Sequence, residues 1–100
     1  MATAFEVLAE PHRRQLLDLL RRGDHPVNAL VQQLGLSQPA VSKHLRVLRE
    51  AGLVDTRVDA KRRVYRLRPH PLREIDTWLA PYRLLWAERL DELERHLDAM

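Results

Sequence analysis

Several side chains in the stretch that begins at Ser37 have the chemistry needed to contact nucleic-acid bases and phosphates. The amide of Gln38 can pair with adenine, the ammonium of Lys43 can donate to guanine, and the hydroxyl of Ser42 can bond several bases. The guanidinium of Arg46 suits a phosphate oxygen, a contact that supplies affinity without sequence information. We therefore expect this stretch to contact double-stranded DNA.

An amphipathic helix over residues 37–51 is expected to hold these side chains on one face. The hydroxyl of Ser37 can cap its start, Pro39 fits its first turn, and Gly52 ends it. At about 100° per residue, the apolar residues that fall on the opposite face are Val41, Leu45 and Leu48. Ser37 and Pro39 lie at the start of the exposed face, so both are included in the predicted DNA contact.

His44 lies about 70° from the centre of the apolar face of this helix. At that angle its imidazole can be half packed and still donate to a phosphate from the edge of the domain. A structural histidine is the alternative, and the residues alone leave both readings open. His44 is included among the predicted DNA contacts on the first reading.

Two shorter helices are expected before residue 37. Residues 11–22 carry leucines at helical spacing and end at Gly23. The next helix places apolar residues at i, i+3, i+4 and i+7, namely Val27, Leu30, Val31 and Leu34. A short break containing Gly35 then leads into the Ser37 helix. Two short amphipathic helices joined in this way are typical of a helix-turn-helix.

A β-hairpin over residues 54–67 is expected next, because the apolar period changes from helical to alternating. Its tip and second strand carry the cations Lys61, Arg62, Arg63 and Arg66. Lys61, Arg62 and Arg63 are predicted to lie along a phosphate backbone, as the wing of a winged helix does. The alternative is a hairpin whose charges only keep its strand edges from pairing with other sheets.

Basic charge is concentrated in the part of the chain that holds these elements. Residues 1–70 contain 13 Lys/Arg and 7 Asp/Glu, a net charge of +6, whereas residues 71–100 contain 4 and 7, a net charge of −3. Residues 37–68 alone hold nine Lys/Arg against three Asp/Glu. Combined with the helix pattern, this distribution favours a polyanionic partner such as DNA.

One long helix is expected from Pro71 onward, with Pro81 either kinking it or dividing it in two. Its apolar stripe is too long for a small core to cover, so we expect a second copy of the chain to cover the rest in a twofold homodimer. The predicted dimer contacts are Ile75, Leu79, Tyr82, Trp86, Leu90 and Leu93, with Phe5 and Leu8 of a short first helix. We expect an aromatic seam, with a ligand pocket as the alternative, at Trp78, Tyr82 and Trp86.

These elements predict one domain over residues 1–100, mainly α-helical with a small β-hairpin. It comprises a DNA-binding core with its wing over 1–70 and a dimerisation helix over 71–100. The chain has no cysteine, and no nucleophile–base pair, phosphate loop or metal cluster occurs at a usable spacing, which argues against an enzyme. We find neither a signal peptide nor a spanning segment, so we expect a cytoplasmic protein with no membrane partner.

Three segments together, LAEPHRRQLLDLL, LGLSQPAVSKHLRVLREAGLV and RRVYRL, resemble the ArsR/SmtB family of bacterial winged helix-turn-helix repressors. The resemblance covers roughly residues 5–68, and SQPAVSKHL is its specific part. It implies a homodimer that binds a palindromic operator and places the helix over 37–51 in the major groove. Members of that family usually leave DNA when a ligand binds, so a small-molecule inducer is a candidate partner, and the residues reveal neither its identity nor whether one exists.

The metal sites of that family are not matched at the corresponding positions. The two cysteines of one site align with Pro26 and Asn28, which cannot replace thiolates on a soft metal. The Asp-x-His pattern of the other site aligns with Asp76 and Trp78, on a helix whose only histidine is His96. Outside the helix over 37–51, the other histidines stand singly in the sequence, namely His12, His25 and His70. We therefore predict neither a metal site nor a cofactor.

The main alternative function is a winged helix that uses its outward face to bind another protein instead of specific DNA. The excess of cations over anions on the helix and the hairpin argues against that alternative. Repression is implied by the resemblance alone, and the residues identify neither the operator nor the regulated gene.

Overall fold

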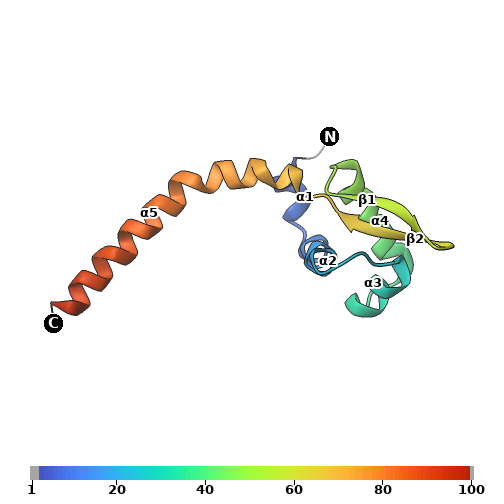
Figure 1. Cartoon of the computed structure of the whole chain (residues 1–100), viewed down its shortest axis with the longest axis horizontal. Coiled ribbons are helices and arrows are strands. Elements are labelled where there is room, and N and C mark those ends of the chain that lie inside the picture. The colour runs from blue at the N-terminus through green and yellow to red at the C-terminus, as the bar shows by residue number, and fades with distance from the viewer. Residues whose placement is uncertain (1–2, 100) are drawn as a thin grey trace.

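The structure, a computed structural model, describes residues 3–99. Along the chain its elements are α1 (Ala4–Leu8), α2 (Pro11–Arg21), α3 (Val27–Leu34), α4 (Gln38–Glu50), β1 (Val54–Asp59), β2 (Arg62–Leu67), the 3-10 turn η1 (His70–Leu72) and α5 (Arg73–Asp98). Figure 1 shows the helices α2 to α4 gathered with the hairpin into one body, from which α5 extends. The predicted fold class, mainly helical with one small hairpin, is confirmed.

The core lies between α2, α3, α4 and the base of the hairpin. Its most deeply buried leucines and valines, each at most 1% exposed, include Leu16, Leu30, Val41, Leu45, Leu48 and Leu53. Three of them, Val41, Leu45 and Leu48, lie on α4 and form the apolar face that helical periodicity predicts. The opposite face of α4 is therefore turned outward by the packing of the core.

The start of α4 follows the local signals in the sequence. The hydroxyl of Ser37 accepts a hydrogen bond from the backbone N–H of Ala40 at 3.3 Å, and Pro39 lies in the first turn. Gly35 ends α3 in the left-handed conformation, with a φ of 68°, which a residue without Cβ adopts at little cost. The break between α3 and α4 is thus short and tightly turned, as a helix-turn-helix requires.

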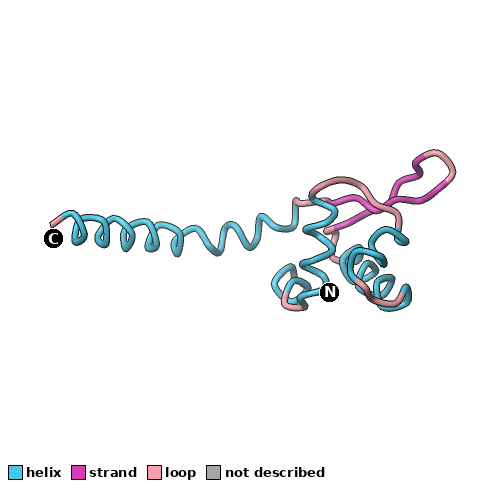
Figure 2. The backbone as a smooth tube through the Cα atoms, turned by 90° about the horizontal axis from the view of Figure 1, so that it is seen from below, coloured by secondary structure: helices cyan, strands magenta, loops and turns pink. Residues whose placement is uncertain are grey.

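The hairpin is packed at its base and free at its tip. Val54 and Val64 are buried, whereas Val58 is 71% exposed. Backbone groups of Tyr65 and His25 exchange two hydrogen bonds, of 3.1 and 2.8 Å, which attach β2 to the segment before α3. Figure 2 shows the two strands of the hairpin projecting from the helices of the body.

Arg66, one of the cations of the second strand, forms an ion pair across the hairpin. It lies opposite Asp55 in the strand register. Its guanidinium donates to both carboxylate oxygens of Asp55, from Nε at 2.5 Å and from Nη2 at 3.2 Å. The hydrogen bond from Arg66 holds the pKa of Asp55 below its ordinary value of 3.8 against a smaller effect of desolvation, and the charges of Arg66, Arg68 and Arg49 add to the lowering.

The last helix, α5, is long, bent and exposed. It continues through Pro81 without dividing, so the expected kink is the alternative that the structure supports, and Figure 1 shows the change of direction. Residues 80–99 are all exposed, and the molecule reaches 62 Å along its longest axis. Among the described residues, no helix combines the length and hydropathy needed to span a bilayer.

Replacing Asp55 with Asn should make stability less dependent on acid pH. Because the pKa of Asp55 is lower in the folded chain than in the unfolded chain, its stabilising effect is complete above about pH 5. That effect is lost as the pH falls through 3.8 and then through the lower folded-state value. We expect Asp55→Asn to be less stable than the native chain at pH 7, with a difference that shrinks as the pH falls below 3.8. Urea unfolding at a series of pH values measures the difference.

The control for this experiment is Asp91→Asn, since Asp91 is exposed on α5 and forms no ion pair within residues 3–99. Its stability should follow that of the native chain at every pH. A loss of stability in Asp55→Asn that stays constant from pH 7 to about pH 2 would contradict the linkage to the Asp55 carboxylate.

Candidate nucleic-acid interface

The outer face of α4 presents the polar residues expected to contact DNA. Gln38, Pro39, Ser42, Lys43 and Arg46 are all exposed. The last four of these line one shallow, open groove along the helix. Because α3 packs against α4 and the apolar face of α4 is buried, this row is held in a fixed orientation on the body.

The hairpin tip carries a second group of exposed cations, Lys61, Arg62 and Arg63. None of them forms an ion pair with any residue in the described range 3–99. Figure 1 shows the tip pointing away from the body at the end opposite α5. These cations are therefore available to an external anion.

Two acidic residues neutralise other cations of the hairpin. Asp24, in the segment before α3, accepts a hydrogen bond of 2.7 Å from Arg57, which lies 33 residues later in the chain. Asp55 holds Arg66 and has Arg68 at 3.7 Å. Periodicity and charge counts did not predict these pairs, although the register that follows from a two-residue turn would place Asp55 opposite Arg66.

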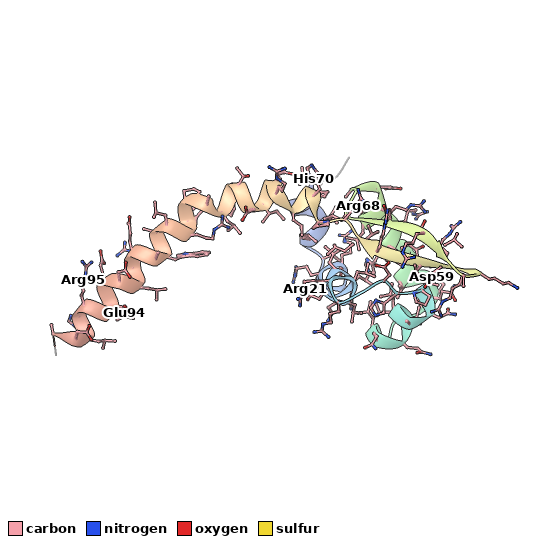
Figure 3. All side chains as sticks on the ribbon, viewed as in Figure 1. Arg21, Asp59, Arg68, His70, Glu94 and Arg95 are labelled. Carbon is pink, nitrogen blue, oxygen red and sulfur yellow. The ribbon has the colours of Figure 1, made fainter. Side chains whose placement is uncertain are left out.

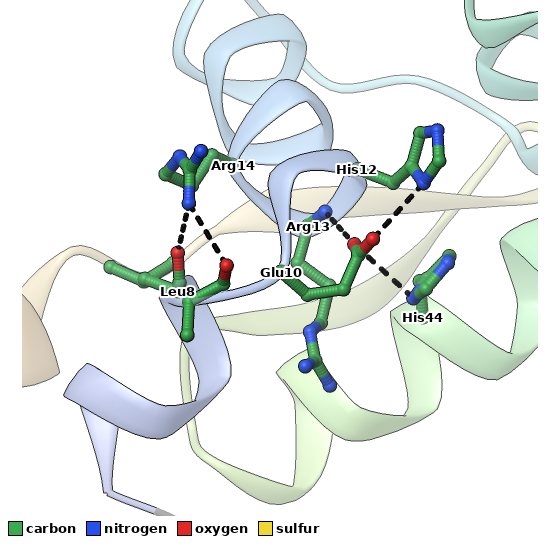
Figure 4. Close-up of polar contacts among 7 residues, drawn as sticks. Leu8, Glu10, His12, Arg13, Arg14 and His44 are labelled. Carbon is green, nitrogen blue, oxygen red and sulfur yellow. Dashed lines mark hydrogen bonds and ion pairs between the residues drawn. The ribbon is translucent and has the colours of Figure 1, made fainter.

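His44 points toward the start of α2 and is only 20% exposed (Figure 4). Its Nδ1 lies 3.9 Å from one carboxylate oxygen of Glu10, and Nδ1 of His12 lies 3.1 Å from the other. Glu10 also caps α2, since it accepts from the N–H of Arg13 at 3.1 Å. The expectation that His12 stands alone is therefore wrong, because the fold brings it beside His44, with 5.7 Å between ring centroids.

The electrostatics of Glu10 follow from these neighbours. Desolvation alone would raise the pKa of Glu10, but the Arg13 N–H, His44 and His12 together hold that pKa below its ordinary value of 4.5. The carboxylate therefore keeps its negative charge beside the two imidazoles. Only the position of His44, near the edge of the apolar face, gave a sequence signal for this contact.

The residues predicted to form a dimer lie on α5 and α1. On α5, Tyr82, Trp86, Leu90 and Leu93 are 43–61% exposed, and the residues nearer the body, Ile75 and Leu79, are half-buried. On α1, Phe5 is 38% exposed and Leu8 is half-buried. Figure 3 shows the α5 side chains standing clear of the body toward Glu94 and Arg95.

Two kinds of contact hold α1 against its neighbours. One is between aromatic rings, and the other is a pair of hydrogen bonds from Arg14 to backbone carbonyl groups. The ring of Phe5 meets Trp78 edge to face at 5.9 Å, and Trp78 meets Tyr82 at 4.8 Å. Nη1 of Arg14 donates to the carbonyls of Leu8 and Ala9 at the end of α1. Further along α5, exposed apolar residues follow these rings at helical spacing, and together they form the apolar strip of α5, namely Trp78, Tyr82, Trp86, Leu90, Leu93 and Leu97.

Comparison with known sequences agrees with this geometry. The family model described as "Bacterial regulatory protein, arsR family" matches residues 10–56. An HTH-type transcriptional regulator of Mycobacterium tuberculosis is 36% identical over 96 residues, which cover 96% of this chain and 87% of that protein. The biofilm growth-associated repressor of Agrobacterium fabrum is 45% identical over 67 residues, which are 67% of this chain but only 57% of that repressor.

Solved structures show the same fold. A crystal structure described as "Possible transcriptional regulator for arsenical resistance" has a TM-score of 0.70 and 43% sequence identity, and covers 93% of this chain and 94% of its own. A winged helix-turn-helix domain from Mycobacterium bovis, described as homodimeric, has a TM-score of 0.58 and 29% identity, and covers 86% of this chain and 77% of its own. This chain belongs to the ArsR family of bacterial winged helix-turn-helix regulatory proteins.

Proposed function

We propose that this chain is a homodimeric repressor of the bacterial cytoplasm that binds a palindromic operator through α4 and the wing formed by β1 and β2. The observation that carries the proposal is the exposed polar row on α4, held in place by the buried opposite face and accompanied by tip cations that form no ion pair within residues 3–99. Among similar proteins, the Agrobacterium fabrum protein is named a repressor, which supports the same role here.

The side chains divide into those that read bases and those that hold phosphates. Gln38, Ser42 and Lys43 occupy the exposed first half of α4, the part of a recognition helix that reaches base edges in the major groove. Arg46 and the tip cations supply phosphate contacts. Ser37 and Pro39 contribute by fixing the helix start at the DNA surface.

His44 takes a supporting role in this proposal. Its imidazole is directed at Glu10 and is mostly covered, so it helps to hold α4 against α2. The structural reading of this residue, left open by the sequence, is favoured over a direct phosphate contact.

The second copy is required by α5. Its apolar residues recur at spacings of three and four, and residues 80–99, which form its outer part, are all exposed. A twofold partner that lays the same face against it would bury the strip on both helices. A twofold pair of recognition helices matches the symmetry of a palindromic operator, and the homodimeric Mycobacterium bovis domain supports this assembly.

Replacing Lys61, Arg62 and Arg63 together with Ala should weaken phosphate binding without disturbing the core, because all three are exposed. We expect the slope of log affinity against log salt to flatten by up to about 0.9 for each phosphate that is no longer neutralised. Fluorescence anisotropy in a KCl series, with a duplex selected from a random pool by the native protein, measures the slope. Arg95→Ala, near the far end of α5, is the control and should keep the native slope. An unchanged slope in the triple variant would exclude the wing from the interface.

Replacing Gln38 with Ala should reduce the protein's discrimination between DNA sequences while leaving its affinity for random DNA almost unchanged. We expect discrimination between the selected duplex and random DNA to fall by about 1–3 kcal/mol, the range for one bidentate base contact, with little change in binding to random DNA. Gln15→Ala, an exposed glutamine on α2, provides the matched control. Competition binding on the two DNAs makes the measurement, and equal losses on both would assign Gln38 to the backbone.

Replacing Leu90 with Glu should separate the two copies, because it places a charge in the middle of the apolar strip. Leu84→Glu makes the same change on the other side of α5, where Leu84 is 64% exposed, and should leave the dimer intact. Sedimentation equilibrium of the native chain and both variants gives the dimer dissociation constant. Equal constants for the two variants, or a native chain that stays monomeric, would contradict the proposed assembly.

A further inference from the structure

Glu10, His12 and His44 bring three metal-binding side chains to one place on the edge of the body (Figure 4). One ligand atom from each residue lies within 4.8 Å of the other two, and all three residues are partly buried. The cluster joins the start of α2 to the middle of α4, so its members come from positions 34 residues apart in the chain. His44 faces Glu10 and is mostly covered, whereas the neighbouring row on α4 that is proposed to contact DNA is exposed.

We propose that Glu10, His12 and His44 form a binding site for a divalent transition metal of the Zn²⁺ type. Two imidazole nitrogens and a carboxylate oxygen are ligands that such ions accept, and three protein ligands leave a fourth position for water. A tetrahedral ion with ligand bonds of about 2.0–2.1 Å separates neighbouring ligand atoms by about 3.4 Å. Nδ1 of His12 lies 3.1 Å from Oε1 of Glu10, and Nδ1 of His44 lies 3.9 Å from Oε2, so the two imidazoles flank the carboxylate on its two oxygens at distances close to that value.

The carboxylate at the centre of the site is already oriented by the fold. The backbone N–H of Arg13 donates to Oε2 of Glu10, which fixes the side chain at the start of α2. A hydrogen bond behind a ligand is the usual way in which proteins hold a metal ligand in position. Glu10 therefore needs little rearrangement to bind an ion between the two imidazoles.

The imidazole of His44 has room for a further ligand. Its side chain is four-fifths covered, yet the imidazole makes no hydrogen bond with any residue in the range 3–99, since its distance of 3.9 Å from Glu10 is too long for one. Within residues 3–99 the only buried side-chain nitrogen or oxygen without a partner is Nε of Arg13, so the ring nitrogens of His44 remain accessible to an ion from solvent. An ion bound between Nδ1 of His44 and Glu10 would supply the missing partner.

The binding test uses tag-free, full-length protein that has been stripped with a chelator and then titrated with Co²⁺. Cobalt replaces zinc in N- and O-ligand sites and reports tetrahedral coordination through its visible absorption bands. We expect one Co²⁺ per protomer in the native chain, displaced by Zn²⁺, with a rise in Tm as Zn²⁺ is added because only the folded chain holds the site together.

Two variants test the ligands. Glu10→Gln keeps a side-chain oxygen to cap α2 but removes the negative charge, and His12→Ala removes a ligand that is 42% exposed. Each should weaken Co²⁺ binding at least about tenfold, since even the removal of a hydrogen bond behind a ligand has an effect of that size. His70→Ala and His96→Ala remove exposed histidines elsewhere and should leave binding unchanged.

Circular dichroism of the metal-free variants verifies that each one is folded before titration. Failure of the folded native chain to bind Co²⁺ would overturn the proposal. So would native affinity in both Glu10→Gln and His12→Ala, or an absence of binding in His70→Ala or His96→Ala. None of these outcomes bears on DNA binding, which the wing and Gln38 variants test separately.

Discussion

Burial of one face of α4 is the interaction on which the rest of the structure depends. Val41, Leu45 and Leu48 are at most 1% exposed, and each contributes about 1.5–3 kcal/mol by leaving water. Turning the helix by half a revolution would expose all three, a cost comparable to the whole stability of a small domain. The core therefore determines which side chains of α4 face outward. The polar row is oriented by the burial of the opposite face and does not need contacts of its own to be held outward.

Charge pairing then determines where an anion can bind. Asp24 and Asp55 neutralise arginines along the flank of the hairpin, whereas the outer face of α4 and the hairpin tip keep cations that are unpaired within residues 3–99. Exposed ion pairs contribute at most about 1 kcal/mol each, so their main effect here is on the distribution of charge and not on stability. The positive potential is thereby concentrated at the two places that a winged helix presents to DNA.

The last helix extends away from the rest of the molecule and keeps the chain from being compact. The radius of gyration is 18.2 Å, whereas a compact chain of 100 residues has about 13 Å. The excess comes from α5, which carries exposed tryptophans and leucines away from the core. The segment that carries this exposed apolar strip, residues 71–100, also holds 4 Lys/Arg against 7 Asp/Glu, so the negative charge lies away from the basic α4 and hairpin.

The sequence by itself determined the elements and the faces they present, because periodicity, caps and breaks act between residues only a few positions apart. The Ser37 cap, the left-handed Gly35 and the alternating residues of 54–67 are such signals. The tertiary structure alone decided which distant polar groups meet: Arg57 with Asp24, and His44 with Glu10 and His12. Such contacts depend on how the packed helices are placed in space, and no local pattern of residue types encodes that placement.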